Sequence, residues 1–230
     1  MLFACELVER KRAMRKKIRF FKQHTMETCG AACALMIADL YGKLKDPNRP
    51  EVPVYPTVCK EIEIYSKYRS HVRYPNSDER YPGMNGPMVA RYLASRDLEV
   101  RLLHSREDMM GNREGYYPEG LFKELYEEYC ACARNLEGLV QITTGVEINC
   151  DTLRRELDAG RHLILQTIVP GDADKIHDHV LHWIVVFGYR DDVFSVCDPL
   201  SSKIELTAKQ MEGYMDTPIG RICIVVGEKA

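Results

Sequence analysis

No stretch of the sequence approaches the roughly 18 consecutive apolar residues that a membrane-spanning helix needs. The N-terminal segment has neither the apolar core nor the small-residue cleavage site of a secretory signal peptide. An excess of one charge sign is also missing, because 32 Lys and Arg stand against 34 Asp and Glu, a net charge of −2. These absences exclude a globally basic nucleic-acid-binding protein and favour a cytoplasmic protein without a membrane span.

Repeats and low-complexity segments are absent too, and what remains is an ordinary globular composition. Hydrophobic residues make up 45% and charged residues 29% of the 230 residues, which argues against a disordered chain. A chain of this length can bury a core without help from metals or disulfides. We therefore expect a single domain over 1–230, with an irregular insertion rich in Pro and Tyr at about 43–86.

Local sequence patterns predict an α+β fold with an antiparallel sheet, in which helices come first and a strand-rich part follows. Thr25 and Thr28 are candidate N-caps of the first helix, Asp151 caps a later one, and Thr207 forms a capping box with Gln210. Helices are predicted at 29–42, 57–68, 87–95, 119–134, 152–159 and after 207, and strands at 98–103, 162–169, 183–189, 193–196 and 221–226. The short polar turn at 190–192 predicts a hairpin between two of these strands.

Nine cysteines is a high and odd number for such a chain. In a reducing compartment most of them are expected to be free thiols that serve as small core residues. They are Cys5, Cys29, Cys33, Cys59, Cys130, Cys132, Cys150, Cys197 and Cys223.

Cys29 differs from the others because it is predicted to open a helix, within QHTMETCGAAC. The helix dipole and the free backbone N–H groups of a first turn favour the thiolate, which is the nucleophilic form. Gln23, six residues earlier, has a side-chain N–H that suits a developing oxyanion. Gly30 would allow a substrate backbone to pass close to the sulfur. Taken alone, however, a cysteine on the apolar face of a helix is usually a core residue.

His182 and Asp198 flank the predicted hairpin, sixteen residues apart. Antiparallel neighbours of that length bring such residues side by side. A neutral imidazole beside Cys29 would accept its proton and later protonate the leaving amine, and a carboxylate would orient the ring. Trp183, next to His182, would either shield the imidazole from water or serve as a core residue.

These motifs together resemble the bacteriocin-processing cysteine peptidases, which are papain-like enzymes often found as the peptidase domain of ABC exporters that cleave double-glycine leaders. The resemblance is carried by Gln-x5-Cys-Gly-Ala-Ala-Cys, by a helix–strand unit of the form Leu-x6-Gly-x-His-Leu-Ile, by His-Trp-Ile-Val-Val-x-Gly-Tyr and by Cys-Asp-Pro. It covers residues 18–42 and 152–226, and more weakly 87–103.

The resemblance implies a papain-like fold and a catalytic set in which Cys29 is the nucleophile, His182 the general base and acid, Asp198 the orienting carboxylate and Gln23 the oxyanion donor. Gly30 would then line the substrate site. No transporter or ATPase segment is recognisable, so a stand-alone enzyme is expected. The interval from Cys29 to His182 is longer than in the exporter domains, and the insertion at 43–86 is expected near the substrate groove or its rim.

Three functions remain open. The first is a cysteine peptidase that cleaves a leader or precursor peptide through a thioester acyl-enzyme, without a cofactor. The second is an acyl or peptidyl transferase, or a small-molecule amide hydrolase, that uses the same triad. The third is a non-catalytic peptide-binding module on the same fold.

The remaining sequence features are interpreted as structural in preference to functional. His177, His179 and His182, with Asp174 and Asp178, form a polar loop beside the active site in preference to a metal site, so no metal is expected. Cys130 and Cys132 face apart on a helix, and Cys33 is a core residue. The basic run at 10–19 is a solvated face or, alternatively, a docking site for an acidic partner.

Overall fold

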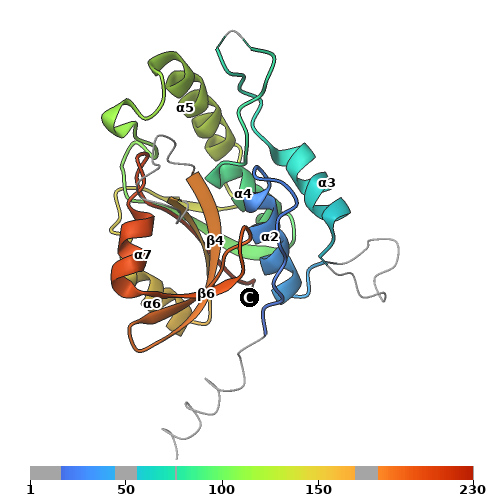
Figure 1. Cartoon of the computed structure of the whole chain (residues 1–230), viewed down its shortest axis with the longest axis vertical. Coiled ribbons are helices and arrows are strands. Elements are labelled where there is room, and N and C mark those ends of the chain that lie inside the picture. The colour runs from blue at the N-terminus through green and yellow to red at the C-terminus, as the bar shows by residue number, and fades with distance from the viewer. Residues whose placement is uncertain (1–16, 45–55, 76, 169–180, 230) are drawn as a thin grey trace, which may run out of the picture.

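The computed structural model describes residues 17–44, 56–75, 77–168 and 181–229. Within these ranges the fold is built around one seven-stranded sheet with the strand order β2-β1-β7-β3-β4-β5-β6 (Figure 1). The strands are β1 (Leu98–His104), β2 (Gln141–Thr143), β3 (His162–Ile168), β4 (Leu181–Arg190), β5 (Val193–Cys197), β6 (Lys203–Thr207) and β7 (Ile222–Glu228). All neighbouring pairs are antiparallel except β1 and β2, which are parallel.

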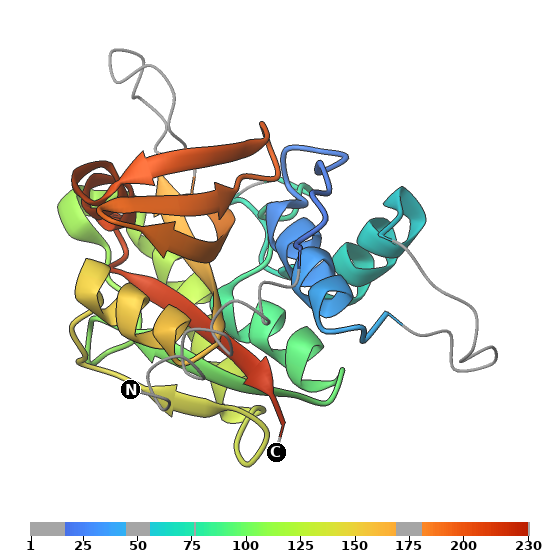
Figure 2. The same ribbon diagram turned by 90° about the horizontal axis from the view of Figure 1, so that it is seen from below.

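Helices cover both faces of this sheet (Figure 2). The helices are α2 (Cys29–Leu40), α3 (Val58–Tyr68), α4 (Gly86–Ala94), α5 (Glu119–Arg134), α6 (Cys150–Asp158) and α7 (Ala208–Met215), and a 3-10 turn η1 lies at Arg113–Gly115. On one face α2 packs on β4 and α4 packs on β1 and β7, with α3 and α5 outside them. On the other face α6 and α7 pack on β3 and its neighbours.

The central strand β7 shows why both faces are closed. Ile222, Ile224 and Val226 belong to the core under α2 and α4, whereas Cys223 and Val225 belong to the core under α6 and α7. Because successive side chains of a strand point to opposite faces, a continuous apolar run requires cover on both sides. The sheet is therefore sandwiched between two helical layers, and the edge near α2 carries the candidate site.

The predicted α+β architecture is confirmed, and the predicted helices and strands occur close to their expected bounds. The prediction of a purely antiparallel sheet was wrong at its edge, where β2 joins β1 in parallel. Neither β2 nor β6 was predicted, because each is short and β6 follows a polar turn. The cap of α6 is Asn149, whose side chain accepts from Thr152 N, and not Asp151. None of the described helices is long and apolar enough to cross a membrane.

Candidate active site

Cys29 is the first residue of α2, as the sequence predicts, and its side chain is buried. Thr28 precedes the helix but does not cap it with its side chain, which corrects that expectation. Instead the Thr28 hydroxyl donates to the backbone carbonyl of Thr25 at 3.0 Å and accepts from the Thr25 N–H at 3.2 Å. This small turn leaves the N–H groups of the first turn of α2 available beside the thiol.

His182 and Asp198 are in direct contact. Nε2 of His182 lies 2.7 Å from Oδ1 of Asp198, and both side chains are buried. The β4–β5 hairpin, with Val185 opposite Cys197, brings the two residues together. The carboxylate is held in turn by the Leu200 N–H at 2.9 Å and the Ser201 hydroxyl at 2.7 Å.

These contacts shift the protonation of both groups. Burial by itself would lower the pKa of His182, but hydrogen bonds with Asp198 and Cys29, together with their charges, raise it to about 9. Burial would raise the pKa of Asp198, but hydrogen bonds from His182 and Ser201 bring it below its ordinary value. The arrangement therefore favours a carboxylate beside an imidazolium, with Cys29 on the other side of the ring.

Gln23 lies in the segment that leads into α2 and is fastened to the Asp198 turn, because its backbone N–H donates to the Pro199 carbonyl at 2.9 Å. Its side-chain Nε2 donates to the Thr25 carbonyl at 2.7 Å. One amide hydrogen is thus used locally, and the second is left for another acceptor.

Sequence reasoning missed Glu61, which holds the same segment from the insertion side. Glu61 lies on α3, is 0% exposed, and accepts from the His24 N–H at 2.8 Å through Oε1. A glutamate in an amphipathic helix gives no sequence signal for such a role, since only the tertiary contact between α2 and α3 brings it next to His24.

We expect Glu61→Ala to lower the free energy of unfolding by about 2–3 kcal/mol, because it opens a cavity at a fully buried position and removes the acceptor of the His24 N–H. Urea denaturation followed by circular dichroism measures this change. The matched control is Glu61→Gln, which keeps an oxygen at the same place and should lose less than half as much. Equal losses in the two variants would contradict a role for the His24 hydrogen bond.

Gly30 and Trp183 contact each other within the core. A Cβ atom added to Gly30 would lie 3.2 Å from Trp183 Cδ1, Met84 Cβ and Val89 Cγ2. The Trp183 indole is buried and donates to the Met84 carbonyl at 2.8 Å. Close packing thus explains why a residue without a Cβ atom is suited to position 30. The expected contact of Gly30 with a substrate backbone stays a prediction.

A groove of about 860 Å³ opens beside Cys29. Its walls come from α2 and its preceding turn, from η1 and the following loop, and from the insertion, which contributes Tyr74, Pro75, Tyr81, Pro82 and Gly83. The expectation that the insertion lies at the groove is therefore confirmed for its described part, and residues 45–55 lie outside that part. Cys29 itself is one of the residues that line this groove.

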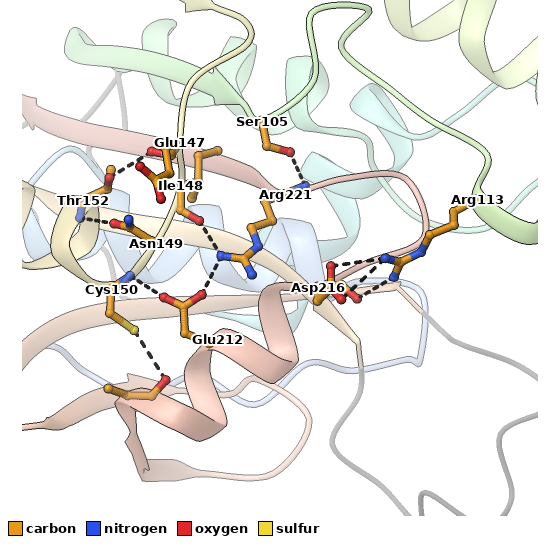
Figure 3. Close-up of polar contacts among 11 residues, drawn as sticks. Ser105, Arg113, Glu147, Ile148, Asn149, Cys150, Thr152, Glu212, Asp216 and Arg221 are labelled. Carbon is orange, nitrogen blue, oxygen red and sulfur yellow. Dashed lines mark hydrogen bonds and ion pairs between the residues drawn. The ribbon is translucent and has the colours of Figure 1, made fainter.

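A second hollow of about 500 Å³ continues beyond the groove, and the two share Arg113, Asp216 and Pro218. Arg113 and Asp216 form a long ion pair, with Nη1 3.4 Å from Oδ1, between the two spaces (Figure 3). Figure 3 also shows Arg221, which donates to Glu212 Oε2 at 2.5 Å.

Cys150 provides an internal comparison with Cys29, because it too is buried at the first residue of a helix. Its backbone N–H donates to Glu212 at 2.7 Å (Figure 3). Burial and the Glu212 carboxylate raise the pKa of Cys150 to about 12. A position at a helix N-terminus is therefore not enough to make a thiol reactive. The charge of the neighbouring side chain determines whether the thiolate is favoured.

The remaining sequence predictions have mixed outcomes. All eight cysteines that the structure describes are free thiols, and Cys33 is buried, with its thiol against the Trp183 carbonyl. Cys130 and Cys132 both lie on α5. His177, His179, Asp174, Asp178 and most of the basic run at 10–19 lie outside the described residues. Of that run, Arg19 forms an ion pair with Asp39 of this chain.

The fold thus places a thiol at a helix N-terminus beside a strand that carries a histidine, and a buried aspartate contacts that histidine. Comparison with solved structures agrees: the chain shares its fold with a protein from Bacillus anthracis assigned to the C39-like peptidases, at a TM-score of 0.53 and 11% identity, over 94% of this chain and 98% of that one.

Two further structures are similar at lower TM-scores. A double glycine motif protease from an AMS/PCAT transporter, in complex with the leader peptide, has a TM-score of 0.47 and 12% identity, over 94% of both chains. The peptidase domain of Streptococcus ComA, a bi-functional ABC transporter, has a TM-score of 0.45 and 10% identity, over 92% of this chain and 99% of that one. No protein-family model and no curated protein matches the sequence.

Proposed function

We propose that the protein is a cysteine peptidase that cleaves an amide bond of a peptide through a thioester acyl-enzyme. The observation that carries this proposal is the placement of His182, which hydrogen-bonds Asp198 at 2.7 Å through Nε2 and also contacts Cys29. Because Nε2 is taken by Asp198, Nδ1 is the nitrogen that exchanges a proton with the thiol.

In the first half of the proposed reaction, Nδ1 of His182 takes the Cys29 proton and the thiolate attacks the carbonyl carbon of the peptide. The carbonyl π electrons move to oxygen, and this oxyanion receives hydrogen bonds from Gln23 Nε2 and from the Cys29 backbone N–H. The C–N bond then breaks, the His182 proton passes to the leaving amine, and a thioester remains.

In the second half, His182 takes a proton from water, and the resulting hydroxide attacks the thioester carbon. The C–S bond breaks, the thiolate takes back the proton from His182, and the acid product leaves. A groove of about 860 Å³ lined by Cys29 gives room for a peptide substrate, and water is the acceptor that the proposal assigns.

The first test is the alkylation rate of each cysteine by iodoacetamide between pH 5 and pH 9, read by peptide mass spectrometry. We expect Cys29 to react at pH 6 at least about tenfold faster than Cys150, because His182 lies beside Cys29 to take its proton, whereas burial and Glu212 raise the pKa of Cys150 to about 12. The His182→Ala variant should remove this advantage, while the rate at Cys150 stays the same. A Cys29 rate that equals that of Cys150 in the wild type would overturn the peptidase proposal and favour a peptide-binding module.

A further inference from the structure

A small side cavity opens off the groove at Cys29. Its volume is about 80 Å³, and it shares Cys29, Tyr81, Gly83 and Leu181 with the groove. At about 15 Å³ for each water-sized group, this space takes roughly five non-hydrogen atoms. That is the size of one medium side chain, whereas the groove outside has room for the chain itself.

The cavity contains polar groups that no described residue satisfies. Oε1 of Gln166 and the hydroxyl of Tyr129 are buried without a hydrogen-bond partner among the described residues. Gln166 is 6% exposed and Tyr129 is 3% exposed, and both line the cavity. A buried polar atom without a partner costs about 1–3 kcal/mol, so a structure that keeps two in one cavity is suited to a ligand that pairs with them.

The strand register explains how these groups come together. On β3, Gln166 lies opposite Trp183 of β4, and on β1, His104 lies opposite Ile222 of β7. The β3–β7 register continues from Leu165 opposite Cys223, so Gln166 and Ile222 are neighbours in the same row. One row of side chains therefore runs across four strands beneath α4 and α5.

His104 adds a further acceptor to this row. Its Nδ1 lies 3.0 Å from the Met109 carbonyl and must donate to it, which leaves Nε2 as a buried acceptor without a partner among the described residues. Burial lowers the pKa of His104 to about 4, so the ring is neutral. The ring stacks edge-on against Tyr129, with centroids 5.6 Å apart. His104 does not line the cavity, so Gln166 Oε1 is the buried acceptor that an incoming N–H group would satisfy there.

The charges around the cavity restrict which substrate side chains it can bind. Glu128 is the only ionisable carboxylate among the described residues that line the cavity, and no described Lys or Arg lines it. Its oxygens accept from the Ser70 hydroxyl at 2.7 Å and the His71 N–H at 2.6 Å. An incoming carboxylate would be repelled by the Glu128 carboxylate, and no described Lys or Arg would pair with it. An ammonium group could pair with Glu128, but Gln166 and Tyr129 are neutral, so its burial beside these two groups would carry a desolvation cost.

We propose that this cavity is a specificity pocket for a neutral carboxamide side chain, Asn or Gln, on the acyl side of the cleaved bond. Its NH₂ group donates to Gln166 Oε1 and its carbonyl oxygen accepts from the Tyr129 hydroxyl. The acyl side is chosen because that part of the substrate stays joined to Cys29, which lines the cavity. This inference rests on the proposed peptidase function.

Peptidyl vinyl sulfones test the pocket without knowledge of the natural substrate. The probes are acetyl-X-Gly and acetyl-Gly-X vinyl sulfones, with X as Asn, Gln, Leu, Asp or Gly, and the rate of adduct formation at Cys29 is read by mass spectrometry. In one of the two positions we expect Asn or Gln to react at least about tenfold faster than Leu or Asp. A pocket built for hydrogen bonds rejects an apolar isostere strongly, because its own polar groups would stay unpaired.

Two variants remove one partner each. Gln166→Met should bring the Asn and Leu rates to within about threefold of each other while the Gly–Gly probe keeps its wild-type rate, which shows that the variant is folded. Tyr129→Phe should reduce the same preference and serves if Gln166→Met fails to fold.

Equal rates for Asn, Leu and Gly in the wild type would overturn the pocket and indicate that water alone fills it. A preference that survives in both variants would overturn it as well. The rate of alkylation by iodoacetamide distinguishes failure of the pocket proposal from failure of the peptidase proposal. If Cys29 reacts faster than Cys150 but shows no side-chain preference, only the pocket is wrong, whereas a Cys29 without enhanced reactivity overturns the peptidase function and the pocket with it.

Discussion

Replacement of Cys29 by alanine is expected to lower the turnover of a cleavable peptide by at least about 10⁴-fold, because no other cysteine among the described residues lines the groove. His182→Ala should cost a similar factor, since it removes both the base for the thiol and the acid for the leaving amine. The double variant should be no slower than the slower single variant, because the two residues act as a unit. Cleavage of a proteome-derived peptide library, read by mass spectrometry, measures all three.

Cys150→Ala is the matched control for this experiment. It also removes a buried thiol from the first residue of a helix, but the thiol it removes lies beside Glu212 and away from any imidazole in the described residues. We expect turnover within about twofold of the wild type. Full activity in Cys29→Ala would contradict the proposed nucleophile, and a comparable loss in Cys150→Ala would show that the effect comes from damage to the fold.

The second large effect is expected from Asp198→Asn. Asp198 is one of the groups that raise the pKa of His182 to about 9, so loss of its charge lowers that pKa. The imidazolium then loses its proton at a lower pH, and the alkaline limb of kcat/KM should move down by about one pH unit or more. An amide oxygen can still accept from the ring N–H but carries no negative charge to stabilise the imidazolium, so kcat/KM at its best pH should also fall, by about tenfold or more.

Ser201→Ala is the comparison for this prediction, because it removes one of the hydrogen bonds to Asp198 and keeps the carboxylate. We expect a loss of less than about tenfold and a smaller shift of the alkaline limb in the same direction. The pH profile of kcat/KM between pH 5 and pH 10 distinguishes the two variants. An unchanged alkaline limb in Asp198→Asn would show that Asp198 does not control the protonation of His182.

The insertion helps to determine which substrates fit the groove. Tyr81 and Tyr117 join their hydroxyls at 2.7 Å, which ties the insertion to the loop after η1 and closes one wall of both the groove and the side cavity. A substrate that suits narrow glycine subsites would leave the side cavity unused. For this reason the proposed carboxamide pocket, and not the double-glycine rule of the family that the sequence resembles, is the expectation to test first.

Much of the candidate site could be predicted from the sequence because its parts are local. Cys29 opens a helix of almost continuously small and apolar residues, and the polar turn at 190–192 joins the two strands that bring His182 and Asp198 together. Asp198 is followed by a short turn whose own atoms hold it, through Leu200 and Ser201. Such patterns depend only on residues that are close along the chain, and they can therefore be recognised without the tertiary structure.

Other features arise only when distant segments meet. Glu61 reaches His24 across the α2–α3 contact, and Gln166 shares a row with Ile222 only because β7 lies between β1 and β3. Their residue types are unremarkable in sequence, since hydrogen-bond partners remote along the chain leave no periodic trace.

The sequence by itself determined the α+β class and most of the helices and strands, and it predicted Gln23, Cys29, His182 and Asp198 as one catalytic set. Only the tertiary structure decided the strand order, the parallel β1–β2 edge, the groove beside Cys29 and the cavity with its unpaired acceptors. The physical reason is that side-chain periodicity and turn chemistry are encoded locally, whereas the order of strands and the shape of a cavity follow from packing between distant segments.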